Sequence, residues 1–576
     1  MELLLAHGDD GSPVLDRGAD PGTAAAHAQP APRRDERFLS DITADANDLA
    51  RQGWAVVATA DADGARLEAA VRALVAARAE DQGDDVLAIR VPRGMDAATA
   101  AAWKARAYPA LYGDDEARRP RYLLLLGDLD GVSLETEQAL AIDGLTGRLA
   151  CTGDAGYGAY ADKVVAWQRA ASPHDRARAV FYTVHDGTGA TAAGHAKLIQ
   201  PCHERCVRIA RDQPRAFRAA VEAHGAPTPD PAELLGLAAA HQPSVLLSMS
   251  HGLGPPRRRR WSPAEARELQ GAMSFGAEGA LAARELASAR FLSGGMWVYF
   301  ACFGAGTPRT SAYHHWLEML ADQGMAGLGP VSAALRGLDH AGGFVSGICK
   351  AALANPDGPL AVLGHIDLAW SYSYEELRVD PAADDAGGGD DRPRRVTGSN
   401  RSLNFFHLMT KLTAGERAGA AALALRLQLG AVGAELTAHY DRCKRQGAGE
   451  GASPADRLAL GNLWMLHQDL LGYALLGDPA VRLPLAVRGG AARAPAGGPA
   501  GADVTARGEL DASELDRLEQ AALAVARDES PGVVAARLGV PRSAIVEAAE
   551  AYRTAGRAAL TALLGRRGDP EQGGGR

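Results

Sequence analysis

The fold is decided by two stretches of sequence, SVLLSMSHG at residues 244–252 and MWVYFACFG at residues 296–304. Each begins with a short run that is apolar on both faces and ends in turn residues. Such runs are typical of central strands in a parallel sheet that helices cover on both sides. In open α/β sheets, functional residues usually lie just beyond the carboxyl ends of the strands. The residues that follow the two runs, His251 and Cys302, are therefore the first candidates for a functional site.

The same kind of run recurs along the chain and predicts an α/β protein. Strand-like runs lie at 54–59, 86–91, 122–126, 179–184 and 360–363. Helical spacing separates several of them, as at residues 67–79. Helical patterns then cover 403–444 and 455–475, and a short strand is expected at 480–483. Strands that alternate with helices favour a parallel sheet between helical layers.

The composition of the chain excludes some classes of function. The chain has 576 residues with 47% hydrophobic residues and a formal net charge of -9, which argues against a protein whose whole surface grips nucleic acid or anionic lipid. The first residues lack a cationic segment before their short apolar run, so no signal peptide is predicted. No stretch has the length of a membrane span. We therefore expect a cytoplasmic protein with no membrane association.

The cysteines point to a reducing compartment. There are six, widely scattered, and none forms a C-x-x-C pair. Cys202 and Cys206 flank His203 at helical spacing, which indicates packing residues more than a zinc site. Cys349 is also interpreted as a packing residue in a helix. No metal or organic cofactor is expected.

The ends of the chain differ in composition from its centre. Residues 1–45 are rich in Ala, Pro, Asp and Gly without periodicity, which predicts a flexible leader or equally a short prosegment. A Gly/Ala/Pro-rich linker is expected at 486–508, followed by a helical tail at 509–566. The tail has the pattern of a helix-turn-helix at 533–553. Its second helix balances its basic residues with acidic ones, so a protein partner is favoured over DNA.

His251 and Cys302 have the chemistry of nucleophilic catalysis. Cys302 follows His251 by 51 positions, and neighbouring parallel strands can bring an imidazole and a thiol together at their carboxyl ends. The imidazole would raise the thiolate fraction and later protonate a leaving amine. The backbone N–H groups of Gly252 and Cys302 could hold an oxyanion, and Gly304 would leave room for a peptide. No third residue orienting His251 is identified. His185 also follows a strand, with Asp186 beside it, but no nucleophile stands at an equivalent position, so this pair is interpreted as a structural turn.

With these residues, the sequence resembles the caspase-like cysteine peptidases, a group that includes caspases, gingipains, separase and CHAT-domain proteases. The gingipain-like branch is the most similar. The resemblance rests on short segments in the same order, which are Leu126-Gly127-Asp128, Gly147-Arg148-Leu149, His251-Gly252, Ala301-Cys302-Phe303-Gly304 and Gly477–Leu483. It covers residues 50 to 485 and implies a three-layer αβα fold with two adjacent α/β subdomains, placed at 46–225 and 226–485. The second subdomain would carry the Cys/His dyad, and the first would contribute to the specificity pocket.

The resemblance also implies where a specificity pocket would lie. Gingipain-like enzymes place an acidic residue from the first subdomain at the base of this pocket, and Asp143, which precedes Gly147-Arg148, is the matching candidate. Asp367 and Trp370 follow the next strand, where such enzymes place a pocket wall. The resulting hypothesis is a cysteine endopeptidase that cleaves polypeptides after Arg or Lys. The alternative is a caspase-fold adaptor with an idle dyad that recruits partners through its helical tail.

Overall fold

The structure is a computed structural model that describes residues 2–15, 18, 45–111, 119–170, 174–214, 217–322, 326–338, 342–375, 401–445 and 454–486. The chain divides into two units, 1–488 and 489–576. Everything described belongs to the first unit. The expected helical tail at 509–566 and all but the first residue of the expected linker lie outside the described residues, as does nearly all of 16–44.

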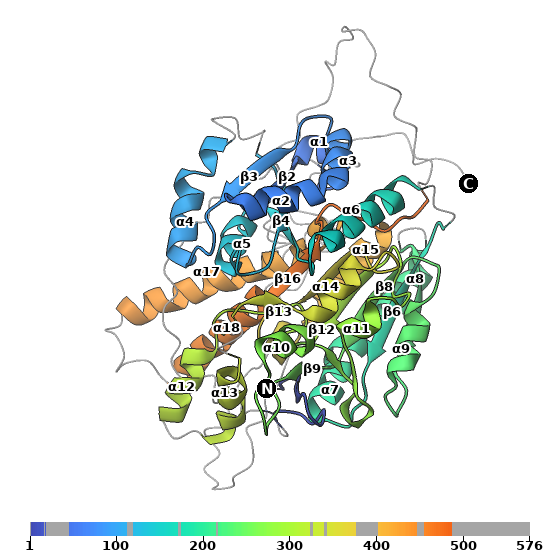
Figure 1. Cartoon of the computed structure of the whole chain (residues 1–576). Helices are drawn as coiled ribbons and strands as arrows, with labels where there is room; N and C mark the ends of the chain where they lie inside the picture. Colours follow the sequence, from blue (N-terminus) through green and yellow to red (C-terminus); the bar gives the residue numbers. More distant parts are fainter. Residues whose placement is uncertain are drawn as a thin grey trace, which may run out of the picture. The chain divides into compact units, whose positions relative to one another are not determined.

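A ten-stranded mixed sheet runs through the described residues (Figure 1). In sheet order the strands are β3 (Leu87–Val91), β2 (Trp54–Thr59), β4 (Tyr122–Leu126), β5 (Leu145–Leu149), β16 (Tyr473–Gly477), β15 (Ala361–His365), β12 (Met296–Phe300), β8 (Ser244–Met249), β6 (Ala177–Thr183) and β7 (Ala219–His224). β16 pairs in parallel with β5 and antiparallel with β15. The strands from β3 to β16 therefore run in the opposite direction to the strands from β15 to β7.

The expected α/β class is confirmed, and the two expected subdomains share this one sheet. The runs at 54–59, 122–126 and 244–249 are strands with the expected bounds. β6 and β7 lie in the same half of the sheet as β8, because β6 pairs directly with both β7 and β8. The predicted boundary at 225 thus separates β6 from β8, its neighbour in the sheet. A division by sequence position could not show this, because strand pairing connects segments that are distant in the chain.

The end of this unit differs from the sequence prediction. The expected helix at 455–475 ends at Leu471 as α18 (Pro454–Leu471), and the apolar residues after it form β16. The expected strand at 480–483 is irregular. A short apolar run fits either a helix or a strand, and here the free edges of β15 and β5 select the strand.

Helices cover both faces of the sheet because successive side chains of each strand point to opposite sides. On β2, Val57 packs with Leu140 of one helical layer, whereas Val56 packs with Leu67 and Leu74 of the other. The main helices around the first half are α2 (Ala62–Ala70), α3 (Arg72–Gln82), α4 (Ala97–Arg106), α5 (Leu134–Ala141) and α6 (Asp154–Arg169). Those around the second half are α8 (Gln200–Asp212), α11 (Ala283–Leu286), α14 (Gly347–Ala354), α15 (Leu403–Ala414) and α17 (Leu423–Arg445).

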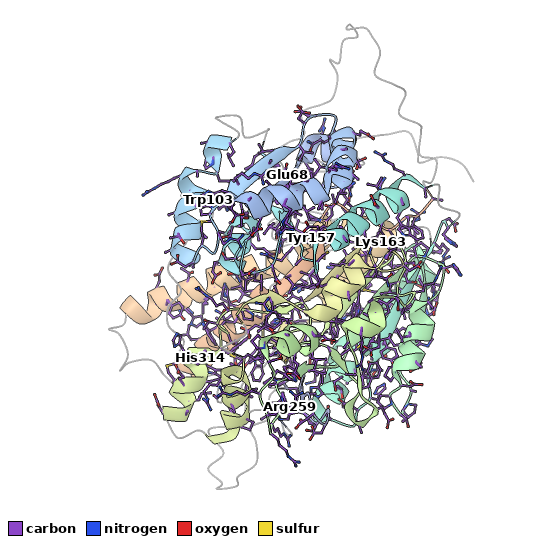
Figure 2. All side chains as sticks on the ribbon, in the orientation of Figure 1. Glu68, Trp103, Tyr157, Lys163, Arg259 and His314 are labelled. Atoms are coloured by element: carbon purple, nitrogen blue, oxygen red, sulfur yellow. The ribbon has the colours of Figure 1, made fainter. Side chains whose placement is uncertain are left out.

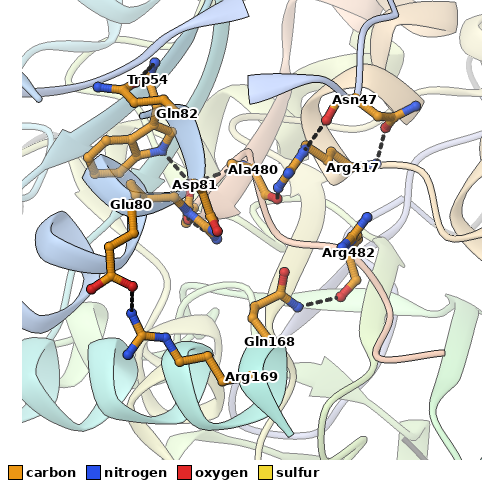
Figure 3. Close-up of polar contacts among 12 residues, drawn as sticks. Asn47, Trp54, Glu80, Asp81, Gln82, Gln168, Arg169, Arg417, Ala480 and Arg482 are labelled. Atoms are coloured by element: carbon orange, nitrogen blue, oxygen red, sulfur yellow. Dashed lines mark hydrogen bonds and ion pairs between the residues drawn. The ribbon is translucent and has the colours of Figure 1, made fainter. Parts of the chain in front are cut away.

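Buried polar contacts tie the two halves together. Lys163 on α6, labelled in Figure 2, donates hydrogen bonds to the carbonyl oxygens of Leu353 (2.6 Å) and Asn355 (2.8 Å) at the end of α14. The segment after β16 is held in the same way, because Arg417 donates to the Asn47 and Ala480 carbonyls (Figure 3). A helix end that is buried in this way has its terminal carbonyl groups satisfied. The halves therefore pack as one unit.

Residues 2–15 are part of this unit, which corrects the expectation of a flexible leader for this part of residues 1–45. β1 (Leu5–His7) pairs in parallel with β9 (His251–Gly254) at one edge of a small four-stranded sheet, and residues 12–14 fold back on β1. The side chains from Leu3 to Leu5 are at most 2% exposed. Three apolar residues are too few to show periodicity in the sequence. They are ordered here because β9 supplies backbone partners.

None of the helices in the described part of the chain has both the length and the apolar character needed to cross a membrane.

Candidate active site

The candidate site lies where three neighbouring parallel strands end side by side. β8 lies between β6 and β12, with Met249 in register with Thr183 on one side and Phe300 on the other. Two or three residues beyond these positions the chain reaches Asp186, His251 and Cys302. The strand order therefore brings a carboxylate, an imidazole and a thiol to one edge of the sheet, as open α/β sheets do with their sites.

The His251 ring is held at its Nε2 atom. Nε2 lies 3.0 Å from the Thr188 hydroxyl, and that hydroxyl donates its own hydrogen to Asp186 Oδ1 at 2.8 Å. Because the hydroxyl proton is committed to the carboxylate, His251 Nε2 is the donor in its bond to Thr188. Nε2 also lies 3.7 Å from Asp186 Oδ2. The neutral ring then carries its lone pair on Nδ1, which is buried without a hydrogen-bond partner.

Burial and charge act in opposite directions on this ring. Desolvation lowers the pKa of His251, whereas the Asp186 carboxylate and the nearby Leu4 backbone raise it. Desolvation is the largest of these effects, so the pKa lies below its ordinary value and the imidazole is neutral at neutral pH. A neutral imidazole with a free lone pair can act as a general base.

Cys302 lies in a strained turn just after β12. The following residue, Phe303, has φ = 56°, a left-handed conformation that is uncommon for a bulky residue. The Cys302 sulfur accepts a hydrogen bond from the Ala369 N–H at 3.2 Å. The side chain is fully buried, and this burial raises the pKa of the thiol. In this arrangement Cys302 is a neutral thiol.

The backbone N–H groups of Gly252 and Cys302 point at one atom. Both donate to the Leu4 carbonyl oxygen, at 2.7 Å and 3.1 Å respectively. These are the distances expected between oxyanion-hole donors and the oxygen they stabilise. Glycine is required at 252, since a Cβ there would collide with the Cys302 carbonyl oxygen. The two donors expected from the sequence therefore converge, and a carbonyl of the chain itself occupies them.

The expected pocket residue Asp367 instead supports the loop beside Cys302. It follows β15 with φ = 98°, and its carboxylate accepts hydrogen bonds from Ser311 Oγ (2.7 Å) and from the Leu368 and Ala312 N–H groups (both 2.8 Å). Its carbonyl accepts a hydrogen bond from the Phe303 N–H at 2.8 Å. Burial nevertheless raises the pKa of this carboxyl group. Asp367 thus connects two loops, and its carboxylate accepts three hydrogen bonds.

Trp370 and Gly304 both lie near the thiol. Trp370 is fully buried, donates its N–H to Asp469 Oδ1 at 2.8 Å and forms an antiparallel bridge with Leu3. The Gly304 carbonyl accepts hydrogen bonds from Ser346 Oγ (2.7 Å) and the Cys349 thiol (3.2 Å). Trp370 therefore pairs with Leu3, next to Leu4, whereas Gly304 joins the turn after Cys302 to α14.

The structure does not bring Asp143 to the thiol. This residue precedes β5, which is three positions away from β12 in the sheet. Its carboxylate pairs with Lys104 at 2.9 Å and with Arg119 at 3.3 Å. Asp143 is therefore paired with cations in the half of the sheet that contains β5, away from Cys302.

A cavity of about 250 Å³ lies beside Phe303. Ser311, Leu335 and His314, the last of which is labelled in Figure 2, are among the residues that line it. Within the described residues, no group of three or more His, Cys, Asp or Glu side chains is arranged to hold a metal ion. Cys202 and Cys206 are both buried in α8.

Asp186 and Thr188 are not among the site residues predicted from the sequence. The signal was present, because Asp186 follows a predicted strand just as His251 and Cys302 do. The missing information was the strand order, which places β6 next to β8.

Some solved structures are similar to this chain. No family model matches the chain, and no curated protein matches it. Among solved structures, one described as a protease is similar with a TM-score of 0.39 and 14% identity over 75% of this chain and 78% of that one. The Arg-specific cysteine proteinase gingipain R is similar with a TM-score of 0.37 and 10% identity over 75% of this chain and 78% of that one.

A complex of the pro- and mature domains of RgpB from Porphyromonas gingivalis is similar at the same TM-score and identity, over 75% of this chain and 80% of that chain. The similar structures thus include cysteine proteinases.

Proposed function

We propose that this protein is a cysteine endopeptidase in which Cys302 is the nucleophile and His251 is the general base and acid. The observation that carries the proposal is the convergence of the Gly252 and Cys302 N–H groups on one peptide carbonyl. Beside them lies a neutral imidazole whose free nitrogen is buried and whose other nitrogen is tied to a carboxylate through Thr188. A packing cysteine needs none of these features.

The reaction would follow from this geometry. His251 Nδ1 takes the thiol proton, and the sulfur attacks the carbonyl carbon to form a C–S bond. The oxyanion is stabilised by the two N–H groups. His251 then gives its proton to the leaving amine as the C–N bond breaks, and a water molecule hydrolyses the resulting thioester. Asp186 acts as a positioning residue, because it keeps the proton on Nε2 and stabilises the imidazolium.

Cleavage after Arg or Lys was the specificity suggested by the resemblance to gingipain-like enzymes. A basic side chain in a buried pocket needs an unpaired carboxylate. Asp143 is already paired with two cations, and Asp367 already accepts three hydrogen bonds. The carboxylates on which this hypothesis depended are therefore engaged elsewhere.

The proposed function is tested by incubating a mixed peptide library with the protein and identifying the cleaved bonds by mass spectrometry. Because residues 2–7 lie across the site, the assay uses both the whole chain and a variant lacking residues 2–15. Hydrolysis that requires Cys302 is the expected result. If neither form cleaves any peptide, the endopeptidase proposal is wrong and the adaptor alternative is favoured, since the complete burial of the thiol and the ring also fits an idle site.

Replacing Asp186 with Asn is expected to reduce kcat/KM by roughly 10²- to 10⁴-fold, the range seen when a carboxylate that orients a catalytic histidine is neutralised. The Asp186 charge raises the pKa of His251. Its loss lowers that pKa, so the acidic limb of the pH profile of kcat/KM should move to lower pH. A rate loss without any movement of this limb would show that Asp186 has only a structural role. Asp63→Asn, at an exposed carboxylate on α2, is the control.

A further inference from the structure

From the backbone contacts around Cys302 we infer that residues 2–7 occupy the substrate cleft in the register of a substrate, with Leu4 in the position of the residue that precedes the cleaved bond. The segment thereby blocks the site, and the pocket that receives Leu4 selects an apolar residue. The inference rests on the proposed function for its chemical meaning. The position of the segment does not depend on that function.

The register follows from the Leu4 carbonyl. In a cysteine peptidase the carbonyl under attack lies in the oxyanion hole, and here the Leu4 oxygen accepts both N–H groups that form it. The bond from Leu4 to Leu5 is then the one presented to Cys302. The Leu4 backbone is also close enough to the His251 ring and to the Cys302 thiol to affect the pKa of each. The Leu4 carbonyl oxygen thus accepts from the backbone N–H of Cys302 itself and from that of Gly252, the residue after His251.

Backbone pairing holds the segment on both sides of this bond. Leu3 forms an antiparallel bridge with Trp370, and β1 pairs with β9 from Leu5 to His7. Addition of a strand to an open edge is a common way in which proteins bind extended peptides. His7 is further fixed by its Nδ1 atom, which lies 3.1 Å from the Pro255 carbonyl oxygen. The segment thus binds as an extended peptide that crosses the whole site.

The chemical class of the preferred residue follows from burial. Leu4 is 2% exposed and belongs to the main hydrophobic core, which also contains Trp370 and Tyr374. The nearby carboxylate of Asp469 accepts the Trp370 and Ser373 N–H groups, both at 2.8 Å, so it is not free to pair with a basic side chain. Placing Arg or Lys there would bury an unpaired charge, which is costly. We therefore expect preference for Leu over Arg.

Inhibition follows because the segment is tethered. A ligand joined to its own site acts at a high effective concentration, so peptides in solution compete poorly. Residues 12–14 fold back on β1 through hydrogen bonds between His7 and Ser12 and between Val14 and Leu5, which keeps the hairpin in place. The thiol under the segment is fully buried and therefore also inaccessible to alkylating reagents.

The first experiment measures access to Cys302 by its rate of alkylation with iodoacetamide. A variant lacking residues 2–15 and a whole-chain Leu4→Asp variant should both react at least about tenfold faster than the unaltered chain, since the tethered competitor is gone or expelled. Asp9→Ala, at an exposed residue of the same hairpin, should react at the unaltered rate. Equal rates in all four proteins would overturn the inference. Leu4→Asp keeps the test valid if the deletion does not fold.

The second experiment does not require catalysis. A capped peptide with the sequence of residues 2–8, Glu-Leu-Leu-Leu-Ala-His-Gly, is titrated by calorimetry into the variant lacking residues 2–15 that also carries Cys302→Ala. Binding is expected, and the peptide with Arg in place of Leu4 should bind at least about tenfold more weakly because its charge is buried without a partner. If the Arg peptide binds as well or better, the apolar preference is wrong. If neither peptide binds, the segment is not a substrate mimic.

These measurements separate the two proposals. Binding of the Leu peptide together with faster alkylation, but without any hydrolysis, would support the inference and contradict the peptidase. Equal hydrolysis by the whole chain and by the variant lacking residues 2–15, with no change in alkylation, would support the peptidase and contradict the inference.

Discussion

Replacing Cys302 with Ala is expected to abolish peptide hydrolysis, with a loss of roughly 10⁴- to 10⁶-fold in kcat, as found when the nucleophile of a comparable catalytic group is removed. The reason is that the remaining His251 and the two N–H donors can orient and polarise a carbonyl but cannot form the thioester. The measurement is the hydrolysis rate of a Leu-containing peptide by the variant lacking residues 2–15, with and without the substitution.

The matched control is Cys206→Ala. Cys206 is also fully buried, and burial also raises the pKa of its thiol, but it lies on α8. Its removal should create a cavity that costs stability and leaves the rate within about threefold, because cavity formation acts on folding. Equal rates in the Cys302→Ala variant and the unsubstituted protein would assign hydrolysis to a contaminating enzyme or to another site, and the proposed role of Cys302 would be abandoned.

Replacing Asp478 with Ala is expected to lower the free energy of unfolding by about 3 to 5 kcal/mol, the cost of breaking a buried ion pair on one side. The Asp478 carboxylate is fully buried and accepts from Arg78 Nε at 2.8 Å, from Trp54 Nε1 at 2.8 Å and from the Ala480 N–H at 2.9 Å. Arg78 is itself only 1% exposed. Without Asp478, its buried guanidinium would still pair with Asp81, whose side chain is partly exposed.

Figure 3 shows Trp54 and Asp81 near the segment after β16, where this network lies. Guanidinium chloride unfolding followed by circular dichroism gives the free energy. Exposed pairs supply the comparison: Asp63→Ala removes one partner of Arg66, which also pairs with Asp154, and one partner of Arg93. The Asp63 and Arg66 side chains are at least half exposed. The effect of this substitution should be within about 1 kcal/mol. A similar small effect for Asp478→Ala would show that the buried network does not stabilise the unit.

The sequence predictions agree best with the structure where the residues of one short segment are enough to determine its secondary structure. The strands at 54–59, 122–126 and 244–249 are apolar on both faces, so burial in a covered sheet is the favourable outcome whichever strands become neighbours. The placing of His251 and Cys302 at strand ends follows from the same runs. Agreement is worst where neighbouring strands determine the secondary structure of a segment. The apolar residues of β16 continue a helical pattern in the sequence, but they form a strand between β5 and β15.

The same distinction applies to the candidate site, of which the sequence predicted some residues and not others. Residue types and order along the chain were enough to select His251, Gly252 and Cys302. They lie just beyond the paired strands β8 and β12, and the backbone N–H groups of Gly252 and Cys302 converge on the Leu4 carbonyl oxygen. Residue types and order were not enough to select Asp186, because its relation to His251 arises from the pairing of β6 with β8. The assignment of Asp143 to a pocket also depended on sequence order, and its ion pairs with Lys104 and Arg119 could not be seen there.

By itself, the sequence determined that the described unit is an α/β protein with a thiol and an imidazole at the ends of covered strands. Hydrophobic runs and turn residues are local signals, and each can be recognised without knowing its neighbours. Only the tertiary structure decided that Asp186 lies next to His251, that the sheet reverses direction at β16, and that the Leu4 carbonyl oxygen accepts both the Gly252 and the Cys302 N–H groups. These features depend on backbone hydrogen bonds and charges between segments up to hundreds of residues apart, and such contacts leave no pattern in either segment alone.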